Sequence, residues 1–179
     1  MEQHLPLIFT AVATCFLGLM CYQDWQARSI SWPVFPALGL ALLAVRLGHQ
    51  PAVQVGCEVL LNWAGVVVLV ATLWLYVRLR FRHLRLHDCL GSGDVLYWAI
   101  AAMYFSPGGF LSYFLASSLL ALLVAALLHW RHRPAAVPVR IPLAGIQAAC
   151  LLGVVAVQEI FPGSSPDWVS RTLPISWTL

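Results

Sequence analysis

Charged residues are scarce in this sequence. Of its 179 residues, 9% are charged and 61% are hydrophobic, whereas about a quarter of the residues in a soluble globular domain carry a charge. No polar stretch is long enough to form a separate soluble domain. The composition therefore predicts a single integral-membrane domain over residues 1–179.

Lysine is absent, and the ten basic residues are all arginine. This absence excludes a Ser–Lys dyad and a Schiff-base lysine. A serine elbow of the GxSG type is also missing, so a rhomboid-like Ser–His site is not expected. The five cysteines occur singly, without a CxxC pair, which argues against a disulfide framework or a zinc ribbon. They are interpreted as small hydrophobic residues: Cys15, Cys21, Cys57, Cys89 and Cys150.

Long apolar runs dominate the chain instead. A helix needs about 20 apolar residues to cross a bilayer, and Pro- and Gly-containing breaks separate the runs. We predict an all-α, polytopic membrane protein with about six transmembrane helices, the first of them an uncleaved spanning helix. The predicted helices cover approximately 5–23, 32–48, 53–77, 94–106, 109–130 and 140–160, followed by a C-terminal tail over 161–179.

The arginines predict how the helices are oriented. Eight of the ten follow the first, third and fifth helices, and positively charged connections stay in the cytoplasm. Both termini are therefore expected to face outward. The eight are Arg28, Arg78, Arg80, Arg82, Arg85, Arg131, Arg133 and Arg140, while Arg46 and Arg171 lie on the other side.

The fourth predicted helix is unusually short. From Asp94 to Ser106 it has 13 residues, which is about 20 Å of helix, whereas the hydrocarbon core is about 30 Å thick. Either this helix does not span the membrane, or it begins below the cytoplasmic surface. The second alternative places the preceding "GSGD" (91–94) in a recess, since irregular backbone at membrane depth has to lie beside protein or water.

Two carboxylates remain after the surface positions are set aside. Five of the seven are explained by the outer ends, by a polar loop, or, for Glu58, by snorkelling or an ion pair with Arg46: Glu2, Glu58, Asp88, Glu159 and Asp167. Asp24 closes the first helix and Asp94 opens the fourth, so both are expected at the cytoplasmic membrane boundary. Two carboxylates at equal depth on different helices are what an aspartic protease requires.

The chemistry of such a pair is specific. Two neighbouring carboxyl groups share one proton because they cannot both ionise easily, so one activates water and the other polarises the amide. From the dipoles of their own helices, Asp94 is expected to be the anion and general base, and Asp24 to hold the shared proton. Gly91 and Gly93, on either side of Ser92, are expected to adopt positive φ and let an extended peptide approach.

Simpler interpretations of each aspartate are open as well. Asp94 alone could merely cap the fourth helix, and Asp24 alone could pair with Arg28 one turn further on. It is their joint occurrence with a short helix that favours a catalytic pair.

Three stretches together resemble the type IV prepilin peptidase family of GxGD membrane aspartic proteases. They are "DWQARSI" (24–30), "GSGD" (91–94) and "IPLAGIQA" (141–148). The chain departs from the family pattern at Ser31, where proline is usual, and at Leu96, where lysine is common. It also has Leu143-Ala144-Gly145 where Phe-Gly-Pro is usual. The insertion with paired CxxC motifs is missing, so the resemblance is to the short, protease-only form, without methyltransferase activity.

The resemblance implies an aspartic endopeptidase that cleaves the leader of type IV prepilin-like or pseudopilin precursors. It would be a multi-pass protein of the bacterial inner membrane, with its active site at the cytoplasmic face. Asp24 and Asp94 would be catalytic, and Gly91, Ser92, Gly93 and Arg28 would form the active-site turn and contact substrate. No metal or other cofactor is implied. The expected partners are the substrate and membrane lipids, not nucleic acid, and no oligomeric state is defined.

Competing interpretations come from other classes. The cluster of His83, His87, Asp88 and Cys89 has a spacing that can bind zinc, although a basic loop against anionic lipid headgroups explains it better. A transporter or assembly component could place Asp24 and Asp94 along a polar pathway, which should continue across the membrane. A presenilin-like intramembrane protease would have its first aspartate in the middle of a helix.

Overall fold

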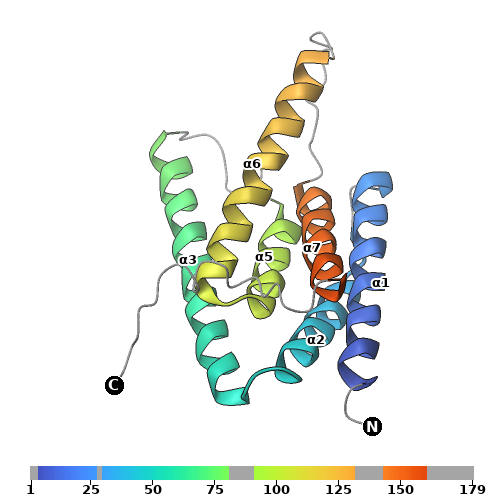
Figure 1. The fold of residues 1–179 in the computed structure, drawn as a ribbon. Helices are drawn as coiled ribbons and strands as arrows, with labels where there is room; N and C mark the ends of the chain where they lie inside the picture. Colours follow the sequence, from blue (N-terminus) through green and yellow to red (C-terminus); the bar gives the residue numbers. More distant parts are fainter. Residues whose placement is uncertain (1–3, 28–29, 81–90, 132–142, 161–179) are drawn as a thin grey trace.

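The computed structural model describes residues 4–27, 30–80, 91–131 and 143–160. Within these residues the chain forms helices and no strands, which confirms the all-α class. Figure 1 shows their arrangement. The helices are α1 (His4–Ala27), α2 (Val34–Leu47), α3 (Ala52–Arg80), α5 (Ser92–Tyr104), α6 (Pro107–Arg131) and α7 (Leu143–Ile160).

Proline and glycine set most of the helix boundaries. Pro33 and Pro51 directly precede α2 and α3, and Pro107 is the first residue of α6, a position where its missing N–H has no helical partner to lose. The backbone is extended at Gly91, before α5, and at Phe105, after it. The predicted helices all occur, with ends that differ by at most four residues. The fourth of them, α5, has 13 residues, so the short helix is confirmed.

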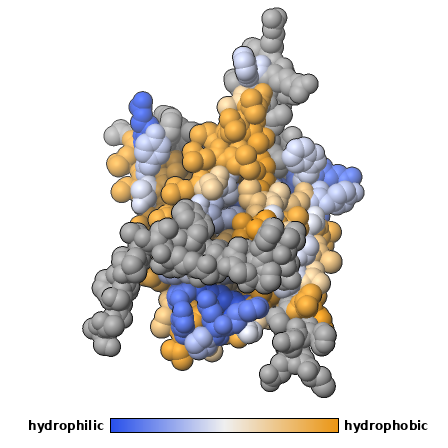
Figure 2. Space-filling view, in the orientation of Figure 1, coloured by the Kyte–Doolittle hydropathy of each residue, from blue (hydrophilic) through white to orange (hydrophobic). Residues whose placement is uncertain are grey.

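Three helices are long and apolar enough to cross a membrane: Leu7–Gln26 within α1, the whole of α3, and Pro107–Leu127 within α6. Helices α2 and α7 are apolar but shorter, and α5 is in neither group. The side of α6 that faces the viewer in Figure 2 is hydrophobic, as expected of a lipid-facing surface. Exposed leucines on α6 include Leu111, Leu115, Leu119, Leu122, Leu123 and Leu127. By length and composition, the described helices therefore include three that could cross a membrane, together with shorter ones.

The short helix α5 lies inside the bundle. It packs against α2, α3, α6 and α7, whereas α1 packs on α2 and α7. In Figure 1, α1, α3 and α6 run toward the upper end, and α5 and α7 begin there and run back. Helices α3 and α6 extend past the level at which α5 begins. The start of α5 is therefore set back from the ends of its neighbours, as in the second of the two alternatives drawn from its length.

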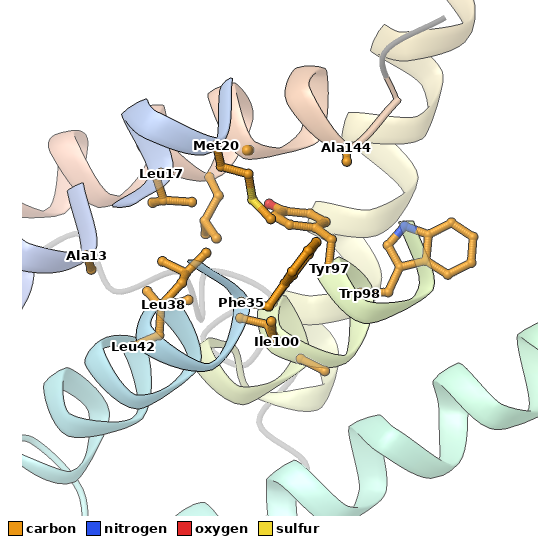
Figure 3. Packing of buried hydrophobic residues seen from close by; sticks show 14 of the residues in the cluster. Ala13, Leu17, Met20, Phe35, Leu38, Leu42, Tyr97, Trp98, Ile100 and Ala144 are labelled. Atoms are coloured by element: carbon orange, nitrogen blue, oxygen red, sulfur yellow. The ribbon is translucent and has the colours of Figure 1, made fainter. Parts of the chain in front are cut away.

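An apolar layer lies below the start of α5. Met20 of α1, Phe35 of α2 and Tyr97 of α5 converge in Figure 3, and Met20 and Tyr97 have no exposed surface. In a membrane such contacts stabilise helix association through van der Waals packing and not through the hydrophobic effect. Met20 is one turn from Asp24, and Tyr97 is one turn from Asp94. The two aspartates therefore lie one helical turn above the buried side chains of Met20, Phe35 and Tyr97, which we call the floor of the site.

The opposite end of α5 is closed by side chains from α2 and α3. Arg46 Nη1 donates to the carbonyl oxygens of Met103, at 3.2 Å, and Phe105, at 2.7 Å. Asn62 Nδ2 donates to those of Ala102, at 2.9 Å, and Phe105, at 2.8 Å. The last carbonyls of a helix have no partner within it, and there is no water in a bilayer core to replace one. These two side chains therefore allow α5 to end early.

The charge of Arg46 is itself compensated. Its guanidinium forms an ion pair with Glu58 of α3, which confirms the pairing predicted from the sequence. Gln54 Nε2 donates to the other oxygen of Glu58, at 2.9 Å. A cation at this place also suits the negative end of the α5 dipole. Arg46, 5% exposed, is thus a structural residue.

Candidate active site

Asp24 lies in the last turn of α1, close to the position predicted for it. Its carboxyl group is buried, with 8% of the residue exposed. Oδ2 accepts a hydrogen bond from the backbone N–H of Gly145, with a donor–acceptor distance of 2.5 Å. Gly145 belongs to the first turn of α7, which is 121 residues away in the chain. The first half of the site is therefore built by α1 and α7 together.

Asp94 is the third residue of α5, after the N-cap Gly91. Its carboxyl group interacts with the backbone amides of Gly91 and Ala144, and both contacts act to lower its pKa. The first contact resembles a capping box, in which a side chain at the third helical position reaches back to the N-cap amide. The alternative in which Asp94 is the N-cap of this helix is wrong, because Gly91 is the N-cap and Asp94 is the third helical residue. Asp94 also interacts with Ala144 of α7.

The two carboxyl groups meet at neighbouring amides of α7. Ala144 binds Asp94 and Gly145 binds Asp24. Both amides lie in the first turn of α7, whose N–H groups have no acceptor within the helix, and the positive end of the helix dipole favours anions there. Helix α7 packs on α1 and on α5. It is therefore the element that brings Asp24 and Asp94 into one site.

Burial and mutual repulsion act on the pair. Asp94 lies in the first turn of α5, outside the three long spanning segments. Its pKa is raised, first by burial and then by the negative charge of Asp24. This is the direction in which two neighbouring carboxyl groups retain a proton, and it is opposite to what the dipole of α5 alone predicts. Burial and the charge of Asp24 outweigh that dipole, and neither could be included in the sequence prediction.

The prediction of positive φ at the glycines is wrong. Gly91 has φ −67° and ψ 139°, and Gly93 lies inside α5 without a left-handed conformation. The reason is that the helix already begins at Ser92, so the "GSGD" segment is a helix start and not a turn. A Cβ at Gly93 would meet Phe35 Cζ at 3.8 Å, an ordinary contact. A Cβ at Gly91 would lie 3.2 Å from Asp94 Oδ2, so Gly91 is needed for space beside the carboxyl group.

Gly145 is a site residue that sequence reasoning missed. A Cβ at this position would lie 2.8 Å from Asp24 Oδ2 and 3.2 Å from Asp24 Cβ, distances that ordinary contacts do not reach. The stretch 141–148 was identified as the start of the last helix, but no role was predicted for it. The signal was the departure at 143–145, where glycine replaces the usual proline and supplies an N–H that proline lacks.

The remaining predicted positions divide into two groups. Ser92 is exposed at the first position of α5, beside an exposed Gly91. The backbone that precedes Asp94 is therefore accessible. Arg28 lies outside the described residues, as do His83, His87, Asp88 and Cys89. In the described part of the chain, no three or more His, Cys, Asp or Glu side chains form a group that could hold a metal ion.

A buried polar network fixes α7 below the site. The Tyr113 hydroxyl of α6 donates to the carbonyl oxygen of Gln147, at 2.6 Å, and lies 2.6 Å from the Tyr97 hydroxyl. Trp98 Nε1 donates to Gln147 Oε1 at 2.8 Å. Gln147 is fully buried and only two residues from Gly145. These bonds hold α5, α6 and α7 in register, which fixes the height of the Ala144 and Gly145 amides.

Fold and site thus describe a helical membrane protein with two carboxyl groups joined at a helix start. Residues 11–126 match the type IV leader peptidase family. This is more than half of the chain, and the chain belongs to that family, which makes it a leader peptidase-like protease. The matched range includes Asp24 and Asp94 but ends before α7. No curated protein and no solved structure matches the chain.

Proposed function

We propose that the protein is an aspartic endopeptidase of the prepilin peptidase type. It removes the leader peptide from type IV prepilin-like or pseudopilin precursors at the cytoplasmic face of the bacterial inner membrane. The observation that carries the proposal is the convergence of Asp24 and Asp94 on the neighbouring amides of Gly145 and Ala144. Membership of the leader peptidase family supports it.

The pair performs the hydrolysis by moving protons. The ionised carboxylate takes a proton from water as the water oxygen attacks the peptide carbonyl carbon, while the protonated partner gives its proton to the carbonyl oxygen. As the resulting gem-diol collapses it returns one hydroxyl proton to the pair, the C–N bond breaks, and the departing nitrogen receives a proton from the pair. One proton shared between two carboxyl groups supplies both roles, so no cofactor is required.

The position of the pair suits a substrate cut at the membrane interface. Arg78 and Arg80 lie in the last turn of α3, at the same end of the bundle as the start of α5 in Figure 1, and positive charge marks the cytoplasmic side. The expected precursors have a short basic leader followed by an apolar helix, and the bond between the two rests at this depth. The exposed Gly91 and Ser92 give the extended junction access to the carboxyl groups.

Features below the pair favour a protease over a transport pathway. The floor residues Met20 and Tyr97 are fully buried, and Arg46 and Asn62 are bound to α5 carbonyls. The cavity between α3 and α6 has an apolar and aromatic lining apart from Asn62. Asp24 also lies in the last turn of α1, whereas a presenilin-like protease would have this aspartate in the middle of its helix.

Co-expression with a prepilin-like precursor tests this function. The precursor should carry a basic leader, a glycine at the junction and an apolar helix, and the product should be examined by N-terminal sequencing. We expect a new N-terminus directly after the junction glycine, only in cells that contain the protein. An unchanged precursor, or a product cut inside the apolar helix, would contradict the proposed function.

A further inference from the structure

The first turn of α7 touches both carboxyl groups although it lies beyond the chain segment that matches the family. Resting on the proposed protease function, we propose that this turn is the positioning element of the aspartate pair. The amides of Ala144 and Gly145 each hold one carboxyl group, and in this chain the glycine at 145 leaves the space that the Asp24 side chain occupies.

The steric part of the proposal rests on three atoms of one side chain. A Cβ at position 145 would lie 2.8 Å from Asp24 Oδ2, 3.2 Å from its Cβ and 3.4 Å from its Cγ. Rotation about χ1 could move the oxygen away, but it cannot move the Cβ, which is fixed to the backbone of α1. Asp24 is also 8% exposed and has little room to turn. A methyl group at 145 would therefore move α1 or its carboxyl group.

Helix α1 contacts residue 145 at both of its backbone polar groups. Gly145 N–H donates to Asp24 Oδ2 at 2.5 Å, and Cys21 Sγ donates to the Gly145 carbonyl oxygen at 3.5 Å. Cys21 and Asp24 are three residues apart, so they lie on the same face of α1. A hydrogen bond from a backbone N–H to a carboxyl group is strongest when that group is ionised. The short contact with the Gly145 N–H therefore favours the ionised form of Asp24.

The register of α7 is set independently of Asp24. Gln147 binds Tyr113 through its carbonyl oxygen and Trp98 through its side chain, two residues after Gly145. These bonds keep α7 from sliding along α1 to relieve a clash. The displacement caused by a side chain at 145 is therefore expected to fall on the Asp24 carboxyl group and not on the whole helix.

Two titratable groups that interact with Asp24 lie on α5 and α1. Asp94 of α5 and Cys21 of α1 interact with it electrostatically, and Cys150 of α7 interacts with Cys21. The charged residue of α2, Arg46, is engaged at the far end of α5. Removal of the Gly145 contact is therefore expected to act mainly on the titration of the aspartate pair.

Gly145→Ala tests the proposal, with Gly153→Ala as the matched control in the same helix. A Cβ at Gly153 would meet nothing within 4 Å. In the precursor-cleavage assay, Gly145→Ala should lower kcat by about 10²-fold, the loss expected when a reacting group moves by about 1 Å. Its residual activity should have an acidic limb at higher pH, because the Asp24 anion loses the hydrogen bond from the Gly145 N–H. Gly153→Ala should cleave like the wild type.

A stability cycle tests the same contact without cleavage. Gly145→Ala should lower the thermal unfolding temperature in the wild-type background, and much less in an Asp24→Gly background, where neither the carboxyl oxygen nor the Cβ of residue 24 is present. Equal destabilisation in both backgrounds, or wild-type cleavage by Gly145→Ala, would overturn the proposal. If the wild type failed to cleave while the stability coupling was present, the proposed function would fail and the positioning contact would stand.

Discussion

The two ends of α5 solve the same problem in different ways. At the C-terminal end, Arg46 and Asn62 supply donors to carbonyls that would otherwise be unpaired, and Glu58 neutralises the arginine. At the N-terminal end, Asp94 interacts with the backbone amide of Gly91 but lies beside a second carboxyl group and near exposed backbone. The first arrangement satisfies every group that takes part in it, whereas the second retains charge repulsion and an opening. Ion-paired and hydrogen-bonded side chains thus close one end of α5, and two neighbouring carboxyl groups lie at the other.

The largest effect on folding is expected from Arg46→Met, at the C-terminal end. This change removes the donor to the carbonyls of Met103 and Phe105 and leaves Glu58 without its cation. Breaking a buried ion pair from one side costs about 3–5 kcal/mol, which thermal or denaturant unfolding in detergent would measure. Arg78→Met is the control, because Arg78 is exposed and its contact over the Trp74 ring is worth about 0.5–1 kcal/mol. Equal losses in the two variants would remove the distinction between the two ends.

At the N-terminal end, the two glycines are expected to differ. Gly91→Ala places a methyl group 3.2 Å from Asp94 Oδ2, and we expect cleavage to fall by about tenfold, equivalent to about 1.4 kcal/mol. Gly93→Ala adds only an ordinary contact with Phe35, so it should cleave nearly as fast as the wild type. The steady-state cleavage rates of the two variants measure this difference. If Gly93→Ala lost more activity than Gly91→Ala, the expected difference would be contradicted, and a special backbone conformation at residue 93 would be indicated.

The smallest expected effect concerns how stability depends on pH. Because the pKa of Asp94 is raised in the folded state, the folded protein binds more protons than the unfolded chain between the ordinary carboxyl range and the raised value. Stability contributed through this group therefore falls as the pH rises through that window. Asp94→Asn should lose this fall, so its unfolding temperature relative to the wild type should increase with pH. If the unfolding temperatures of the two proteins changed with pH in parallel, the folded state would not raise the pKa of Asp94.

Much of the fold could be predicted because its signals are local. Long apolar runs and the prolines at 33, 51 and 107 are sufficient to place the helices, and the shortness of α5 follows from the position of Ser106-Pro107. The ion pair between Arg46 and Glu58 follows from their location near the same end of neighbouring helices. Asp24 and Asp94 can be identified from their charge and their expected depth in the membrane, and this identification does not require knowledge of helix packing.

The remaining features of the site depend on which helices contact one another. Local sequence patterns do not carry this information. In a membrane both the lipid-facing and the buried faces of a helix are apolar, so hydrophobicity does not show that α7 lies between α1 and α5. The role of Gly145 was missed for this reason. The assignment of positive φ to Gly91 and Gly93 was wrong because the helix begins before Asp94, and the start of a helix is uncertain in sequence.

Cleavage by purified carboxyl variants tests the central claim most directly. The turnover of a prepilin-like precursor should be compared for the wild type, Asp24→Asn and Asp94→Asn, with Asp88→Asn as a carboxylate control. Asparagine still accepts an amide hydrogen bond, so folding should persist, but neither variant can exchange the shared proton. We predict that each loses about 10²–10⁴-fold in rate, the contribution of general acid–base catalysis, while Asp88→Asn retains activity. Near wild-type cleavage by Asp24→Asn or Asp94→Asn would contradict the account.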